Sequence, residues 1–182
     1  MSGIVCPCST DDLIEKSLIK IDGGLVTLHN LIQDMGREIV RQESLHEPGK
    51  RSRLWFCDDV VKVLNKNKGT SNTQILILDF PKDEAHLKGP NGEAVNWDGK
   101  AFEKMENLKT LIIRNGSFSK GPIHLPNSLR VLKWQGYPLQ SLPCYFYPKK
   151  LSILELPDSC LKPCRPIQAS GFATVCVFMN SH

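Results

Sequence analysis

The sequence predicts an α+β protein in two parts, a small domain of helices with one hairpin and a later array of short parallel strands. Three observations carry this prediction. Apolar residues recur at helical spacing over residues 28–40, glycines separate two short apolar runs near residue 23, and a leucine pattern repeats in the second half. Of the 182 residues, 41% are hydrophobic and 23% are charged, as is ordinary for a globular protein.

The first elements expected are a short helix and a hairpin. Residues 9–12 are polar and suit the start of a helix, which residues 13–17 continue. Residues 18–21 and 25–28 are rich in apolar and β-branched side chains and flank Asp22-Gly23-Gly24. Glycine readily adopts the positive φ that a tight turn needs, so these two runs are expected to pair.

A long amphipathic helix is expected from Leu28 to about Ser44. Its apolar residues have the spacing of one helical face. We expect this face to pack against a core. It consists of Leu28, Leu31, Ile32, Met35, Ile39 and Val40.

A basic turn and a third helix follow. The turn carries Lys50, Arg51 and Arg53, which fit a solvated surface or a phosphate-contacting patch equally well. The third helix is expected to be capped by Asp58 and ended by Gly69. Its apolar side is formed by Val60, Val61 and Leu64.

The second half contains an internal repeat. A Leu-x-x-Leu-x-apolar pattern begins at Leu108, Leu129 and Leu151, at intervals of 21 and 22 residues. This is the pattern of a leucine-rich repeat, in which each unit adds one strand to a solenoid with a parallel sheet. An irregular earlier copy is expected over residues 75–80, in the form Ile-x-x-Leu-x-Phe. Further core side chains are expected ten residues after each first leucine, at Phe118, Leu139 and Leu161.

Strand residues between the inward-facing leucines are expected to form an outward face, because side chains alternate across a strand. The repeat register places Lys133 beside Glu155 as an opposite-charge pair. The apolar members of the face favour contact with a protein. The face consists of Thr110, Ile112, Arg114, Val131, Lys133, Gln135, Ile153 and Glu155.

A family resemblance lies in residues 27–55, which read TLHNLIQDMGREIVRQESLHEPGKRSRLW. This stretch resembles the winged-helix end of the nucleotide-binding (NB-ARC) module in plant disease resistance proteins. The branch that it resembles combines a Toll/interleukin-receptor-like domain, a nucleotide-binding domain and leucine-rich repeats. The family has a Met-His-Asp triplet at the start of this helix, and its His is implied to contact the phosphate of bound ADP. Leu28, His29 and Asn30 occupy the triplet here, with an amide in place of the carboxylate.

The resemblance covers about residues 11–163 and implies two domains. Residues 11–70 are expected to form a winged-helix domain and residues 71–163 the first leucine-rich repeats. Residues 1–10 are unmatched, and residues 164–182 are expected to be a non-repeat tail. These features imply a truncated immune receptor that acts in protein recognition and regulation of defence signalling, coupled in the full receptor to an ADP/ATP switch. The expected partner is a pathogen effector or the receptor's own switch module.

The sequence shows no pattern typical of an enzyme or of a cofactor site. A phosphate loop ends in Gly-Lys-Ser/Thr, and neither Gly49-Lys50 nor Gly99-Lys100 is followed by Ser or Thr. The NAD-cleaving Toll-like domain of the family is not matched either, so no catalysis and no bound nucleotide are expected of this chain. The seven cysteines are irregularly spaced and lack the ligand sets of a zinc site, so no metal is expected.

A DNA-binding winged helix is the alternative interpretation. Asn30, Gln33, Arg37 and Arg41 lie on the long helix and are residue types that read bases. Residues 1–70 carry ten Lys/Arg and ten Asp/Glu, however, so specific nucleic-acid binding is not expected. No apolar stretch reaches the roughly 17–25 residues of a membrane-spanning helix, and a cytoplasmic or nuclear location is expected.

The last repeat is expected to lack a cap. Residues 171–182 do not resume the leucine spacing, and a repeat buries its apolar face only against neighbours. We therefore expect self-association through an exposed apolar patch. This patch is formed by Leu151, Leu154, Leu156 and Leu161.

Overall fold

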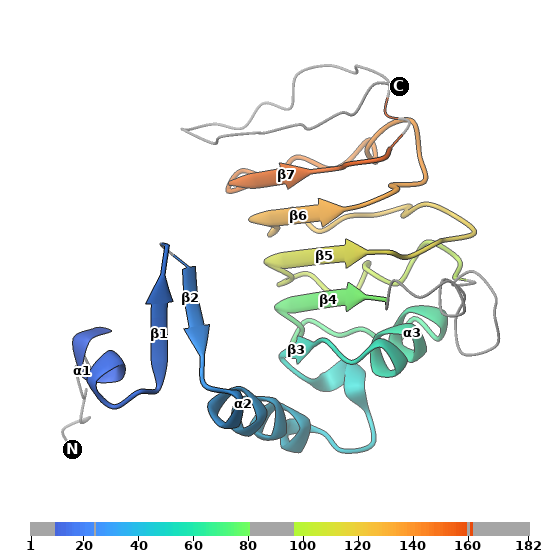
Figure 1. Ribbon diagram of the computed structural model, residues 1–182. Helices are drawn as coiled ribbons and strands as arrows, with labels where there is room; N and C mark the ends of the chain where they lie inside the picture. The colour runs from blue at the N-terminus through green and yellow to red at the C-terminus, as the bar shows by residue number, and fades with distance from the viewer. Residues whose placement is uncertain (1–9, 24, 81–96, 160, 162–182) are drawn as a thin grey trace, which may run out of the picture. The chain divides into compact units, whose positions relative to one another are not determined.

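The computed structural model describes residues 10–23, 25–80, 97–159 and 161 (Figure 1). The chain divides into two compact units between Gln42 and Glu43.

The described residues of the N-terminal unit form two helices and one hairpin. Helix α1 spans Thr10–Glu15, strands β1 and β2 span Ile19–Asp22 and Leu25–Leu28, and helix α2 spans Asn30–Glu43. The two strands pair antiparallel, and Gly23 has a φ of +55° in the turn. The predicted hairpin and long helix are therefore confirmed, with α2 beginning two residues later than expected.

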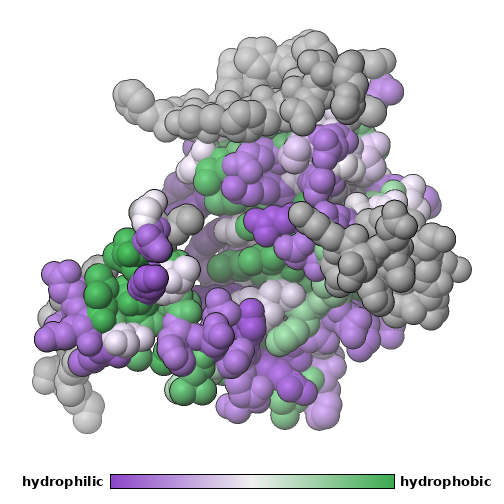
Figure 2. All heavy atoms as spheres, in the orientation of Figure 1, coloured by the Kyte–Doolittle hydropathy of each residue, from purple (hydrophilic) through white to green (hydrophobic). Residues whose placement is uncertain are grey.

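The apolar side of α2 is exposed, and the prediction that it packs against a core is wrong. Leu31, Met35 and Ile39 are 63%, 54% and 64% exposed, whereas Val40 is buried. Figure 2 shows apolar side chains at the surface of this unit. The spacing makes the helix amphipathic, but a two-stranded hairpin and one short helix give the small unit too little apolar surface to cover it.

The C-terminal unit is built on one parallel sheet. Its five strands follow the chain order β3-β4-β5-β6-β7 and lie one above another (Figure 1). Each added strand pairs with the one before it, so the sheet grows in one direction. The strands are β3 Arg53–Leu54, β4 Ile75–Asp79, β5 Thr110–Arg114, β6 Val131–Trp134 and β7 Ile153–Glu155. The turn η1, Pro48–Lys50, precedes β3, and helix α3, Cys57–Asn65, connects β3 with β4.

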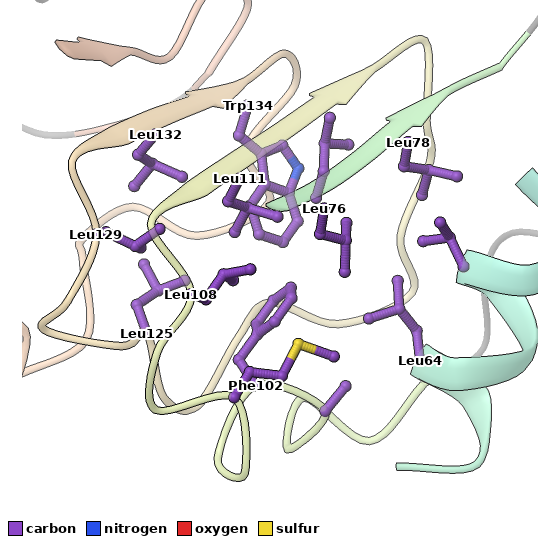
Figure 3. Packing of buried hydrophobic residues seen from close by; sticks show 14 of the residues in the cluster. Leu64, Leu76, Leu78, Phe102, Leu108, Leu111, Leu125, Leu129, Leu132 and Trp134 are labelled. Carbon is purple, nitrogen blue, oxygen red and sulfur yellow. The ribbon is translucent and has the colours of Figure 1, made fainter. Parts of the chain in front are cut away.

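Two rows of buried side chains run across this sheet, and one of them consists of Leu78, Ile113 and Trp134. Leu76 pairs in register with Leu111, which pairs with Leu132, and Leu132 pairs with Leu154. Figure 3 shows the first three of these leucines pointing into the interior that Leu64 of α3 also lines. Phe118, Leu139 and Leu161 pack against the same cluster as expected.

The register of β4 differs from the expected copy. Leu76 pairs with Leu111 and Leu78 with Ile113, so the pattern begins at Thr73 and not at Ile75. Thr73 is fully buried, and its hydroxyl lies 3.2 Å from the carbonyl oxygen of Arg51, to which it donates a hydrogen bond. A threonine that hydrogen-bonds the preceding turn replaces the first leucine of the pattern.

Helix α3 also departs from expectation. It begins at Cys57 with Phe56 at the N-cap and no side-chain cap, so Asp58 lies in the first turn instead of capping it. The helix ends at Asn65, before Gly69. A domain boundary was expected near residue 70, but β3 pairs with β4 and α3 contacts β4, which places both with the sheet.

The described end of the sheet has no exposed leucine patch, contrary to expectation. Leu151, Leu154 and Leu156 are at most 2% exposed. They belong to the same buried cluster as Phe146, and Leu161, the fourth leucine of the expected patch, is partly buried against it. The predicted tail, residues 164–182, lies outside the described residues.

Candidate recognition surface

The outward face predicted from the repeat occupies neighbouring positions on β5, β6 and β7. Thr110, Val131 and Ile153 are aligned in one row, and Ile112, Lys133 and Glu155 in the next. Their side chains are half-buried, except that Ile153 is 36% exposed. Strand β4 extends both rows by Ile75 and Ile77. The result is a continuous surface with an apolar middle.

Charges on this face are largely paired within it. Lys133 Nζ lies 2.9 Å from Glu155 Oε1, so the ion pair expected from the register is present. Arg114 Nη1 lies 3.2 Å from Asp79 Oδ2 on the neighbouring strand. Both pairs are partly solvated, and each therefore contributes little to stability, about 0–1 kcal/mol.

A polar network lies where the strands end, and the sequence reasoning missed most of it. Asn115 donates from its side-chain amide to Asp79 Oδ1 at 3.2 Å, and Gln135 donates to Asp158 Oδ2 at 2.9 Å. Asn115 and Asp158 have φ values of +52° and +57°. Asn and Asp tolerate this conformation better than most residues, so polar residues after the strand pattern were the available signal.

The nucleotide-sensing triplet lies at the junction of β2 and α2. Leu28 is the last residue of β2, and Asn30 is the first of α2. His29 between them is an N-cap, because its carbonyl accepts the Gln33 N–H at 3.1 Å and its Nδ1 accepts the Leu31 N–H at 3.3 Å. The Nδ1 atom must carry no proton to accept this bond, which leaves the proton of a neutral ring on Nε2.

The basic turn proves to be structural at Arg51. This side chain is 4% exposed, and its Nη1 lies 2.7 Å from Asp59 Oδ2 on α3. Its Nε donates to the carbonyl oxygen of Ser44 at 2.8 Å. Lys50 forms an ion pair with Glu47, whereas Arg53 is exposed. The sequence left two interpretations of this turn open, a solvated surface and a phosphate-contacting patch. Because Arg51 is buried and paired, a phosphate-contacting patch would not include it.

The candidate DNA-reading cations of α2 are engaged with carboxylates of the same helix. Arg37 pairs with Asp34 at 3.2 Å and Arg41 with Glu38 at 3.8 Å. Such pairs lower the positive potential that phosphate binding needs. The geometry gives no support to DNA recognition by this helix.

Burial shifts the pKa of two groups in the C-terminal unit. It raises the pKa of the Cys57 thiol, which donates to the carbonyl oxygen of Asp79 at 3.0 Å, and it raises the pKa of the Tyr137 hydroxyl well above its usual range.

Across the described ranges, no group of His, Cys, Asp and Glu is arranged to hold a metal ion. The helices in these same ranges are all too short or too polar to cross a membrane.

Comparison with known proteins finds a family model for the N-terminal part of the chain and relatives that cover most of its length. A family model described as "Disease resistance protein Roq1-like, winged-helix domain" matches residues 1–44. Disease resistance proteins TAO1, RRS1B and RPP2B of Arabidopsis thaliana are 34%, 36% and 31% identical over 82%, 84% and 83% of this chain.

The chain belongs to the plant disease resistance proteins. It spans 13%, 12% and 13% of the lengths of these three relatives. The winged-helix match ends at residue 44, close to the division between the compact units at Gln42 and Glu43. The triplet of the family therefore lies in the N-terminal unit and the outward face in the C-terminal unit.

Proposed function

We propose that the five-stranded sheet is the beginning of a leucine-rich-repeat solenoid whose outward face recognises a protein in defence signalling. The observation that carries this proposal is the register, which aligns the predicted face residues across consecutive strands with an apolar middle. Half-buried isoleucine and valine side chains in such rows offer apolar area to a partner. The names of the relatives support a role in disease resistance.

A chimera tests this role. In Disease resistance protein TAO1, the matching segment is replaced by this chain, and defence output is measured in leaf tissue. We expect the chimera to give a regulated response, and we expect Ile112→Asp with Val131→Asp to abolish it without lowering protein level. Lys62→Glu on α3 is the control and should leave the response unchanged. A response that survives the paired substitution would contradict the proposal.

We also propose that, in a complete receptor, His29 couples the winged helix to ADP. Because Nδ1 is used in capping α2, the donor left for a phosphate is Nε2–H, which has no partner among the described residues. Asn30 is the first residue of α2, and the first turn holds no carboxylate. Asn30→Asp should strengthen the off state by restoring the carboxylate of the family triplet beside His29. Unchanged ADP retention and basal signalling in the full-length receptor would contradict this role.

A further inference from the structure

Charged residues that border the outward face are distributed unequally between its two sides. Lys109 and Arg130 directly precede β5 and β6, and backbone hydrogen bonds of 2.8 Å and 2.7 Å align Lys109 with Arg130 and Arg130 with Ser152. Lys149 and Lys150 come just before β7. These four exposed cations, Lys109, Arg130, Lys149 and Lys150, form what we call the basic edge.

The basic edge is not neutralised by the residues that the structure describes. Lys109 Nζ donates to the neutral side chain of Gln74 at 2.9 Å, and none of the four cations lies in an ion pair within the described ranges. Glu106 is the carboxylate closest in sequence to Lys109. Because the described ranges hold no ion pair for any of the four cations, this edge is positive.

The other side of the face is neutral to negative. There Arg114 is paired with Asp79, and Asp158 is exposed and accepts one hydrogen bond from the neutral amide of Gln135. Between the two sides lie the apolar residues of β4 to β7, which include Ile75, Ile112 and Val131. The face is therefore ordered across the strands as positive, apolar, and neutral to negative.

We propose that the outward face binds a protein segment that places an apolar row on the isoleucines and a row of carboxylates over the basic edge. This inference rests on the proposed function of the face as a recognition surface and names the chemistry of its partner. Adjacent strands are about 4.8 Å apart, so cations on successive strands match carboxylates spaced along a segment that crosses the strands. Charge complementarity of this kind selects partners and speeds their encounter.

Two synthetic helical peptides of about 18 residues, roughly five turns, test the proposal with the full chain. Both carry the same leucine row, flanked by glutamates in one peptide and by lysines in the other. Binding is followed by fluorescence anisotropy at low salt and at about 0.3 M salt, where screening is strong. We expect the glutamate peptide to bind about tenfold more tightly at low salt and to lose most of this advantage at high salt.

Paired variants assign the effect to residues. Lys109→Glu with Arg130→Glu should remove or invert the preference, whereas Lys62→Glu with Lys104→Glu, which changes the charge equally, should keep it. Equal affinity of the two peptides, or no binding of either at about 1 mM, a weak limit of about −4 kcal/mol, would overturn the proposal. Equal competition by oligothymidylate would assign the edge to phosphate binding and overturn it too.

A further pair of variants distinguishes failure of the proposed recognition function from failure of the acidic-partner proposal. Ile112→Ala with Val131→Ala should weaken both peptides, because it removes apolar contacts that they share. If these substitutions matter while the two peptides bind equally, the acidic partner is wrong and the recognition face stands. If they change nothing for either peptide, the face itself is not a recognition surface.

Discussion

His29 caps α2 through a bond that an alanine cannot make. We expect His29→Ala to lower the helicity of the N-terminal unit and its stability, by about 1 kcal/mol or less, since the Leu31 N–H loses its acceptor. His29→Asn supplies another acceptor and should restore the helix. Circular dichroism through a urea titration measures both variants. Equal curves for the alanine and asparagine variants would show that the imidazole is not needed as a cap.

The same pair of variants separates capping from nucleotide sensing. Asparagine can cap the helix, but it does not reproduce the Nε2–H that we propose for the phosphate. In a complete receptor, a His29→Asn variant that keeps α2 intact yet releases ADP faster would assign the two roles to the two ring nitrogens.

Cys57 should be a slow thiol. Burial raises its pKa, so less of it is thiolate at a given pH than of a free thiol, and its sulfur is less accessible to a reagent than that of the exposed Cys144. We expect iodoacetamide at about pH 8, near the usual pKa of a free thiol, to modify Cys144 well before Cys57. Peptide mass mapping of the native chain gives both rates. Urea should remove the difference, because unfolding returns Cys57 to water.

At the level of elements, the change from glycine to alanine is expected to have opposite effects on stability at two positions. A Cβ on Gly49 would lie 1.8 Å from the carbonyl oxygen of Lys68, so η1 or the turn after α3 must move. We expect Gly49→Ala to destabilise the C-terminal unit by about 1–3 kcal/mol. Gly36 in α2 has no atom within 4 Å of a Cβ, and Gly36→Ala should stabilise the helix by about 1 kcal/mol. Thermal melts that move in the same direction would contradict this.

Most strands could be predicted from the sequence because their leucines repeat at nearly constant spacing. The pattern could not place β4, because Thr73 takes a leucine position and is satisfied by carbonyls of a turn more than twenty residues earlier. It also missed β3, which has two residues and follows the basic turn. Side chain to main chain bonds between distant segments leave no periodic signal.

The residues of the outward face could also be predicted from the repeat, whereas the polar contacts at its boundary could not. Alternation along a strand identifies which residues point outward. It does not specify that Asp79 accepts from Arg114 and Asn115, because these contacts depend on how consecutive strands stack. The failed prediction for α2 has another origin. Periodicity identifies an apolar side of a helix but not whether another element covers it.

For the whole molecule, hydrogen exchange should divide the chain at the boundary between the compact units. The N-terminal unit buries only Val40 among its described apolar side chains, whereas the C-terminal unit has a continuous core. We expect amides of β5 and β6 to exchange only through global unfolding. Those of α2 should exchange through local opening that costs little free energy. Mass spectrometry of the intact chain, with residues 43–182 as a comparison, measures this. Equal protection of α2 and β6 would contradict it.

Self-association stays a prediction for the whole chain, without the leucine patch first expected to cause it. Leu151, Leu154 and Leu156 are buried and cannot form a dimer contact. Polar substitutions on the surface near them should therefore leave the fraction of dimer, measured by light scattering, unchanged. The exposed apolar side of α2 is the other surface through which the chain could self-associate. Met35→Ser with Ile39→Ser should reduce any dimer if that helix is responsible.

Repeat arrays change their length over evolution by gaining or losing whole units. Units that begin at Leu108, Leu129 and Leu151 are interchangeable in shape, because each presents a leucine to the same row of its neighbours. Thr73 is not interchangeable, since its hydroxyl is held by carbonyls of Gly49 and Arg51. A duplicated unit inserted ahead of Thr73 would bury that hydroxyl against apolar side chains, at a cost that a point mutation does not easily remove. Insertions and deletions in this lineage should therefore accumulate beyond β4, and the junction of β3 with β4 should persist as the fixed point from which the array grows.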